Sequence, residues 1–136
     1  MVTNMQPWRR YLRLIGGLVV VLCVVAGIWR ALAPEPAGVS ISPRNVYRLE
    51  YYDVSPLLRL LRYRDMKFPS FVRLYRINPE TLLGESRVVD LWLNGDLYWY
   101  LDPPINAIQV GNDIVFENVP PECTDCPRLT DAQVMP

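Results

Sequence analysis

The feature that most constrains this sequence is an uncharged apolar run near its amino end. The run extends from Leu14 to Trp29 and reads LIGGLVVVLCVVAGIW. With its flanks, it approaches the roughly 20 residues that a helix needs to cross a bilayer. A helix buried in a protein core would carry a polar stripe along one side, and this run has none. The sequence therefore predicts one transmembrane anchor over residues 12–33.

The flanks of the run predict its depth and its orientation. Aromatic and basic side chains suit the two headgroup regions, and the candidate interface anchors are Trp8, Arg9, Arg10, Tyr11 and Trp29. Arg13 adds to the positive charge before the run, whereas Arg30 alone follows it closely. The positively charged flank of a membrane helix stays on the cytoplasmic side. We therefore expect residues 1–11 in the cytoplasm and the domain after the helix on the other side of the membrane. Lys67 is the only lysine among 14 basic residues, a usage typical of GC-rich bacteria. We therefore expect a single-pass bacterial inner-membrane protein with a periplasmic domain.

A cleaved signal peptide is the main alternative for this segment. Ala31-Leu32-Ala33 matches the small-residue pattern that signal peptidase recognises. However, Pro34 would follow the cut, and Arg30 lies unusually close to the apolar run. These two residues favour an uncleaved anchor.

The remaining chain predicts a small exported domain that is mainly β, of the α+β class. Residues 34–43 form a proline-containing linker, 44–119 an antiparallel β domain, and 120–136 a proline-rich tail. Alternating or apolar runs predict a meander of five to six strands, at 46–53, 71–77, 88–93, 97–101, 107–110 and 114–118. Ser55-Pro56 predicts the start of one short helix, which we expect to pack on the sheet.

Two turn signals predict hairpins. Asn94-Gly95 is the strongest short hairpin signal, and a two-residue loop would pair Trp92 with Leu97. Gly111-Asn112-Asp113 predicts a second hairpin.

The cysteines predict a structural disulfide rather than a reactive centre. Cys123 and Cys126 lie three positions apart among prolines, without the strand-helix setting of a redox motif. Redox activity remains an alternative, as do free thiols or bridging to a partner. Zinc would need two further ligands, and the chain has no histidine. We therefore expect no metal, no cofactor, no catalytic residue and no enzymatic activity. A small meander also offers little room for a small-molecule ligand.

Charge distribution and aromatic side chains indicate where a partner could bind. The net charge is zero with a pI near 6.2, which argues against nucleic-acid binding. Residues 44–87 carry nine basic and five acidic side chains, whereas residues 88–136 carry one and eight. The two halves attract each other, or they face lipid headgroups and partners of opposite charge. Candidate partner-binding residues are Trp92, Tyr98, Trp99, Tyr100, Arg59, Arg62 and Arg64. Core filling is the alternative for the aromatic residues.

Three sequence segments resemble those of a known group of proteins. They are residues 42–52 around Tyr47-Arg48-Leu49-Glu50, residues 71–75, and residues 83–90. They resemble small membrane-anchored or secreted bacterial proteins of poorly known function. Some of these proteins are encoded beside secretion-system toxins as immunity proteins. The resemblance implies a protein-binding role and assigns no functional residue.

The leading hypothesis is a membrane-anchored periplasmic binding module that neutralises a toxin acting in the periplasm. Its partners would be the bilayer and another protein. The second hypothesis is an accessory subunit of an envelope or secretion complex, docked through its membrane helix. The third is a thiol–disulfide protein that uses Cys123 and Cys126.

Overall fold

The computed structural model describes residues 6–136, and the chain divides between Ala33 and Pro34 into two compact units. The first unit contains one helix, α1 (Gln6–Leu32). In the described chain this is the one helix long and apolar enough to cross a membrane, over Trp8–Leu32, by length and composition. None of that span is buried inside the protein. Residues 1–5 of the predicted cytoplasmic segment lie outside the described residues.

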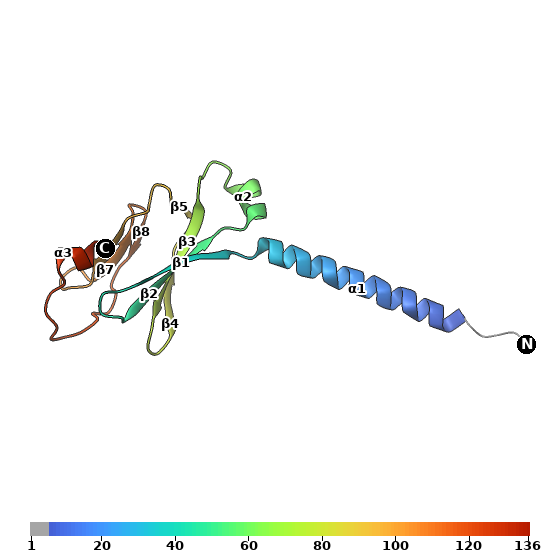
Figure 1. Ribbon diagram of the computed structural model, residues 1–136, viewed down its shortest axis with the longest axis horizontal. Helices are drawn as coiled ribbons and strands as arrows, with labels where there is room; N and C mark the ends of the chain where they lie inside the picture. Colours follow the sequence, from blue (N-terminus) through green and yellow to red (C-terminus); the bar gives the residue numbers. More distant parts are fainter. Residues whose placement is uncertain (1–5) are drawn as a thin grey trace, which may run out of the picture. The chain divides into compact units, whose positions relative to one another are not determined.

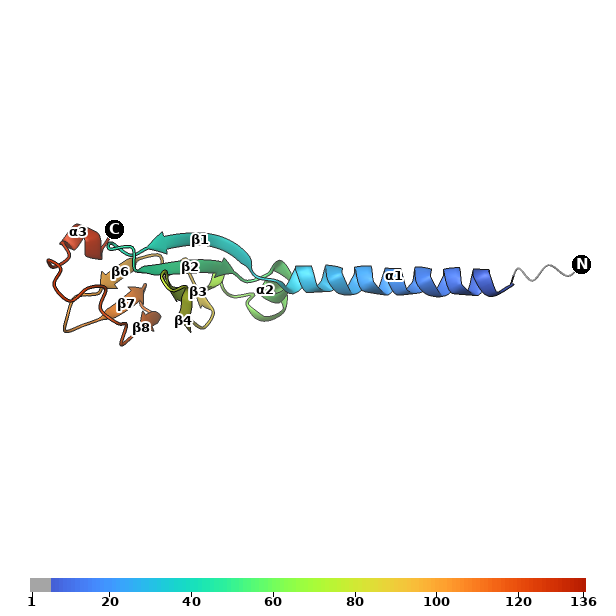
Figure 2. The ribbon, with the colours of Figure 1, turned by 90° about the horizontal axis from the view of Figure 1, so that it is seen from below.

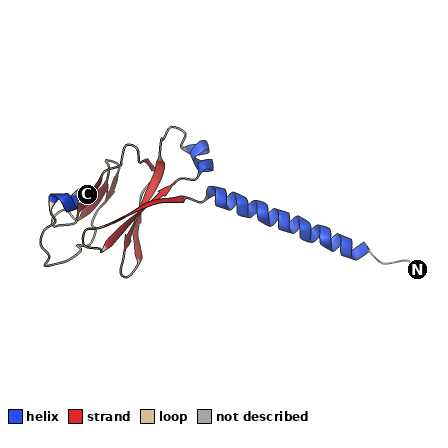
Figure 3. Ribbon diagram, in the orientation of Figure 1, coloured by secondary structure: helices blue, strands red, loops and turns tan. Residues whose placement is uncertain are grey.

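The second unit contains eight strands in two antiparallel sheets (Figures 1 and 3). The first sheet has the order β1-β2-β3-β4, and β5 also pairs with β3. The second has the order β6-β7-β8. The strands are β1 (Glu35–Ile41), β2 (Tyr47–Asp53), β3 (Pro69–Arg76), β4 (Thr81–Glu85), β5 (Val89–Asp90), β6 (Leu97–Tyr100), β7 (Ala107–Val110) and β8 (Ile114–Phe116). Two short helices complete the unit, α2 (Pro56–Arg62) and α3 (Asp131–Val134).

The core forms between the two sheets because each strand turns alternate side chains inward. In β2, Tyr47 and Leu49 are fully buried, while Arg48 between them stays partly exposed. The fully or almost fully buried apolar core residues of the other strands are Val72, Leu74, Val89, Trp99, Ile108, Val110 and Ile114. The expected α+β class, with an apolar amino-terminal helix ahead of antiparallel strands, is confirmed.

Several predicted elements are present with small changes in their bounds. The strand predicted at 46–53 is β2, and the strand predicted at 71–77 is β3, which begins two residues earlier. The hairpin around Gly111 is β7–β8. α2 begins after Ser55, whose hydroxyl accepts a hydrogen bond from the Leu58 amide at 3.4 Å, as an N-cap does.

The predicted linker at 34–43 is wrong, because most of it forms β1 at the margin of the first sheet (Figure 2). β1 pairs with β2 from Glu35↔Asp53 to Ile41↔Arg48, with an irregularity between Pro36 and Gly38. A marginal strand tolerates proline because one of its sides needs no hydrogen-bond donor. β4 was also not predicted, so eight strands in two sheets replace the expected meander of five to six.

The predicted Asn94-Gly95 hairpin is also wrong. β5 stops at Asp90 and pairs with β3, and β6 pairs with β7, so Trp92 and Leu97 do not face each other across a ladder. The Asn94 side chain is buried and holds neighbouring loops together instead of exposing a two-residue turn.

Two further expectations need correction. The segment 120–136 is no free tail, since Leu129 packs against the core and Asp131–Val134 forms α3. α2 does not bury an apolar face on the sheet, because none of its residues is buried.

Candidate functional site

An open cleft of about 670 Å³ lies between the margin of the first sheet and the beginning of the second. Its volume falls in the range of roughly 300–1,000 Å³ that is usual for ligand sites. The sequence predicted little room for such a cleft. Its lining residues are Ser40, Tyr51, Leu91, Asn94, Gly95, Asp96, Leu97, Tyr98, Met135 and Pro136.

One wall of the cleft comes from β1 and β2. Ser40 pairs with Leu49 and Gly38 with Tyr51, so Ser40 and Tyr51 share the face that carries the core residue Leu49. Burial raises the pKa of the Tyr51 phenol, against a smaller opposing effect of its hydrogen bond with Ser40. Tyr51 therefore presents a neutral phenol and an apolar ring to whatever enters the cleft.

The opposite wall comes from β6. Leu97 and Tyr98 line the cleft, and the Tyr98 ring stacks on Tyr100 with centroids 5.7 Å apart. In the described chain, β6 pairs only with β7, and β1 pairs only with β2. Each strand therefore has a side without a ladder partner, which is the feature that strand-adding peptides use. α3 contacts β6, and its residue Val134 shares a second hollow with Tyr100, whereas Leu97 and Tyr98 line the cleft.

Asn94 lines the cleft, and its hydrogen bonds fix the loop before β6. Its side-chain amide donates to the Asp90 carbonyl at 3.0 Å and to the Asp113 carboxylate at 2.8 Å. Its side-chain oxygen accepts from the Asn112 and Asp113 amides at 2.9 and 3.1 Å. Gly111 packs directly against Asn94 with a φ of +57°, a conformation that suits glycine. The loop is thus held to the β7–β8 turn and cannot shift independently.

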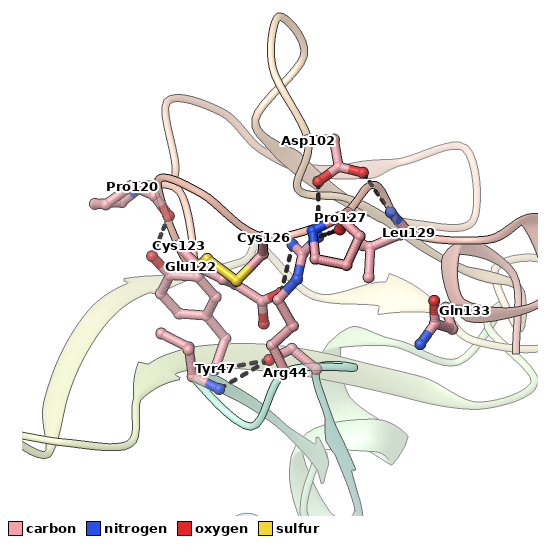
Figure 4. Close-up of polar contacts among 12 residues, drawn as sticks. Arg44, Tyr47, Asp102, Pro120, Glu122, Cys123, Cys126, Pro127, Leu129 and Gln133 are labelled. Carbon is pink, nitrogen blue, oxygen red and sulfur yellow. Dashed lines mark hydrogen bonds and ion pairs between the residues drawn. A yellow bond between two sulfur atoms is a disulfide. The ribbon is translucent and has the colours of Figure 1, made fainter.

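Arg44 anchors the carboxy-terminal segment (Figure 4). The last two residues of that segment line the cleft. The Arg44 guanidinium donates to the Asp102 and Glu122 carboxylates at 3.1 and 3.3 Å, and to the Pro127 carbonyl at 2.6 Å. Asp102 in turn accepts the Leu129 amide at 2.7 Å. We call these five residues the Arg44 clamp.

The ion pairs of the Arg44 clamp connect the basic half of the domain, residues 44–87, with the acidic half, residues 88–136. The pKa of Asp102 lies below its usual value, mainly because of the Leu129 amide and with a further effect of Arg44. The Glu122 side chain is fully buried, and Arg44 supplies its ion pair. The Tyr47 hydroxyl adds a hydrogen bond to the Pro120 carbonyl, and burial raises its pKa.

The disulfide predicted between Cys123 and Cys126 is present, with Cα atoms 5.8 Å apart (Figure 4). Glu122 precedes the ring and Pro127 follows it, so Arg44 holds both of its ends. In the described chain no helix begins at these cysteines, whereas redox-active pairs of this spacing open a helix.

The predicted partner-binding residues separate into three places. Trp99 is 1% exposed and belongs to the core, so its assignment to a partner surface is wrong. Tyr98 and Tyr100 lie beside the cleft. Trp92 is exposed near Lys67, and the Arg59 guanidinium donates to the Lys67 carbonyl at 2.5 Å.

The other predicted residues are exposed. Arg62 and Arg64 form no ion pair with any described residue. The membrane-interface candidates Trp8, Arg9, Arg10, Tyr11 and Trp29 all lie on α1.

Sequence reasoning missed the residues that organise the site, namely Arg44, Tyr51 and Asn94. Arg44 lies in a turn and Tyr51 lies within the strand predicted at 46–53, and neither position marks a distant partner. The opposite charges of the two halves were the one signal that pointed toward the Arg44 pairs. The described residues contain no group of three or more histidine, cysteine, aspartate or glutamate side chains placed to hold a metal ion.

No family model, no curated protein and no solved structure matches this chain.

Proposed function

We propose that this protein is a membrane-anchored binding module that captures a segment of another protein in the cleft between its sheets. The observation that carries the proposal is the cleft itself, which joins apolar and tyrosine side chains to two strands with an unpaired side. Tyrosine anchors and unpaired strand backbone are what protein interfaces use for affinity and register. Asp96 adds an acidic group at the same place, which favours a basic partner segment.

In this proposal α1 crosses the bacterial inner membrane, with the amino end in the cytoplasm and the β domain in the periplasm. Arginines before the apolar span support that orientation, because positive flanks stay inside. The disulfide supports an oxidising compartment. Alkaline phosphatase fused after Pro136 is expected to be active, and a reporter that fluoresces only in the cytosol is expected to be dark. The reverse pattern would overturn the location.

The proposed partner is a toxin that acts in the periplasm, as the resemblance to immunity proteins implies. An anchored domain searches a surface instead of a volume, which raises its effective concentration near an incoming toxin. Co-expression should protect cells from the periplasmic product of a neighbouring toxin-like gene. Unchanged killing would contradict the toxin part of the proposal.

The cleft itself is tested by light-activated crosslinking in living cells. A photoreactive phenylalanine analogue replaces Tyr98, and the same analogue replaces Val115 on β8 as a control, since Val115 is exposed and does not line the cleft. We expect a discrete adduct from position 98 and none from position 115. The charge substitution Leu97→Asp should abolish the adduct. Equal adducts from both positions, or none from position 98, would overturn the cleft as the binding site.

A structural accessory subunit is the second candidate, and α1 itself favours it. A Cβ added at Gly16 or Gly17 meets nothing within 4 Å, so this part of α1 is free for close helix packing. Replacing residues 1–33 with a cleavable export signal separates the two candidates. A binding module still binds its partner after release, at a lower effective concentration, whereas a subunit docked through α1 loses its activity.

A further inference from the structure

A second exposed surface lies at the end of the β domain that is nearest to α1 along the chain. Glu35 follows the end of α1 by three residues, so its Cα lies within about 11 Å of that end. Glu35 pairs with Asp53 and shares a hollow with Arg59, Leu60 and Phe68. α2 and its neighbours are thus tied by a short connection to the segment that would leave a membrane.

α2 carries an apolar face without a protein cover. Leu57, Leu60 and Leu61 are spaced to share one side of the helix, and Leu60 and Leu61 are 69% and 71% exposed. Helices of two turns are marginal in water and depend on packing of their apolar side. Among the described residues nothing buries this side, so another apolar phase is the natural cover.

Aromatic residues continue the same surface. The Lys67 ammonium lies 3.3 Å from the centre of the Trp92 ring, and the Phe68 ring centre is 5.9 Å from that of Trp92. The Asp90 carboxylate holds these segments together by accepting the amides of Lys67, Phe68 and Trp92 at 2.8 to 3.1 Å. Exposed tryptophan beside lysine is a pairing that suits the headgroup region of a bilayer.

The segment that contains α2 is positively charged, and the acidic residues Glu35, Asp53 and Asp90 lie at its margin. From Ser55 to Phe68 the chain contains four basic residues and one acidic residue, Asp65. Arg59, Arg62 and Arg64 form no ion pair with a described residue. Leucines on one side of a short helix and arginines around it are the composition of helices that lie in a membrane surface.

We propose that the α2 surface, formed by Leu57, Leu60, Leu61, Phe68 and Trp92 with the surrounding basic residues, lies on the anionic surface of the bilayer that α1 crosses. The leucines and Trp92 enter the headgroup region, and the guanidinium groups bind lipid phosphates. The short connection from α1 favours lipid over a protein occupant, because it keeps α2 close to the membrane. The inference rests on the anchor in the proposed function and is independent of the partner in the cleft.

The test uses the full chain in lipid nanodiscs. Leu61→Cys in a Cys23→Ser background carries an environment-sensitive fluorophore, and Val115→Cys in the same background is the matched control, while Cys123 and Cys126 stay paired. The discs contain phosphatidylcholine alone or with phosphatidylglycerol, with or without lipids that bear a quencher at the headgroup–acyl boundary. We expect a blue-shifted, quenched label at position 61 in the anionic discs and an unquenched label at position 115. Changing Arg59, Arg62 and Arg64 to glutamine should reduce the quenching at position 61.

Each other outcome is decisive. Co-elution of protein and lipid with an unquenched label at position 61 overturns this inference and leaves the anchor intact. Failure to co-elute with lipid counts against the proposed function. A blue shift without quenching would show that protein, not lipid, covers position 61, and it would overturn the inference. Equal quenching in neutral and anionic discs overturns the role of the arginines.

Quenching of tryptophan by brominated lipid gives a second readout. It should fall when Trp92→Phe is added to a Trp8→Phe, Trp29→Phe chain, and an unchanged signal contradicts the proposal.

Discussion

Gly111 accepts no side chain, for two independent reasons. Its φ of +57° disfavours any other residue, and a Cβ there would lie 2.4 Å from three atoms of Asn94, one of them the backbone Cα. We expect Gly111→Ala to lower the free energy of unfolding by about 2–4 kcal/mol. Thermal unfolding in detergent, followed by near-ultraviolet circular dichroism, measures the loss.

Gly38→Ala is the matched control for this substitution. A Cβ at Gly38 would meet only the Tyr51 ring, at an ordinary 3.9 Å. Its unfolding temperature should stay close to that of the parent protein. Equal losses from the two alanine substitutions would contradict the packing of Gly111 on Asn94.

Arg44 illustrates how one side chain can fix a whole segment. Arg44→Met would leave the Glu122 carboxylate buried without its ion pair, which costs about 3–5 kcal/mol when such a pair is broken from one side. We expect that loss, together with faster proteolysis within residues 120–136. Adding Glu122→Gln should restore part of the stability, because the unpaired charge is then removed.

Arg87→Met serves as the control for the Arg44 variant. Arg87 is exposed and lies 3.9 Å from Asp113, and exposed pairs of this kind contribute between roughly 0 and 1 kcal/mol. If the Arg44 and Arg87 variants unfold at the same temperature, the Arg44 clamp does not hold the segment.

Ionisation of the Asp102 carboxyl group makes the free energy of unfolding depend on pH. The Leu129 amide and Arg44 favour its charged form and lower its pKa in the folded protein. The resulting stabilisation is complete above the unfolded value of about 3.9 and is lost as the pH falls through the folded value. Urea unfolding from pH 5 downward should therefore show a shallower decline for Asp102→Asn than for the parent. Asp125→Asn, at an exposed position in the same segment, should keep the parental slope, and equal slopes for all three proteins would exclude this role.

At the scale of elements, the disulfide ring and the Arg44 clamp act on the same segment. Closing a ring of about four residues stabilises by about 2 kcal/mol in the chain-entropy description. We expect Cys123→Ser with Cys126→Ser to lose that amount. The loss should be smaller when Arg44→Met is already present, because the ring then closes a segment that is already detached. A double-mutant cycle by chemical unfolding measures this coupling, and strictly additive losses would mean that the two features are independent.

Elements whose signals are local were predictable from the sequence. β2 alternates polar and apolar residues, α2 begins with Ser55-Pro56, and the turn of β7–β8 contains Gly111. The disulfide followed from the spacing of its cysteines. These patterns act within a few residues, so one sequence is enough to find them.

Elements that depend on distant partners were missed. From its sequence alone, β1 with Pro36 resembles a linker, because its pairing with β2 is not visible in the sequence. Asn94-Gly95 has the composition of a hairpin turn, yet β5 pairs with β3 and Asn94 bonds to the β7–β8 turn. In both places tertiary pairing outweighed the local preference.

The candidate site was less predictable than the fold for the same reason. The sequence predicts both Tyr98 and Trp99 as partner-binding residues, but adjacent strand residues point to opposite faces, and Trp99 is buried in the core. The remaining parts of the cleft come from β1, β2 and the carboxy-terminal residues. A site assembled from segments so far apart leaves no contiguous pattern.

At the scale of the whole molecule, the two units differ in what stabilises them. Among the described residues, the buried core lies within residues 34–136, whereas the apolar side chains of α1 have no protein cover. We expect a chain that begins at Pro34 to fold in detergent-free buffer and to unfold within a few degrees of the full-length protein. Differential scanning calorimetry of both proteins checks this. A truncated chain without a cooperative transition would show that the β domain depends on α1.

The path of the polypeptide through the β domain sets the order in which the domain can mature. Ribosomes deliver Arg44 and Tyr47 long before Glu122, Pro127 and Leu129, the residues that complete their surroundings. Until those last residues are added, Arg44 has Asp102 but lacks its partners Glu122 and Pro127. A chain that stops shortly before Pro120 is therefore expected to hold Arg44 through Asp102 alone and to leave the Tyr47 hydroxyl without the Pro120 carbonyl.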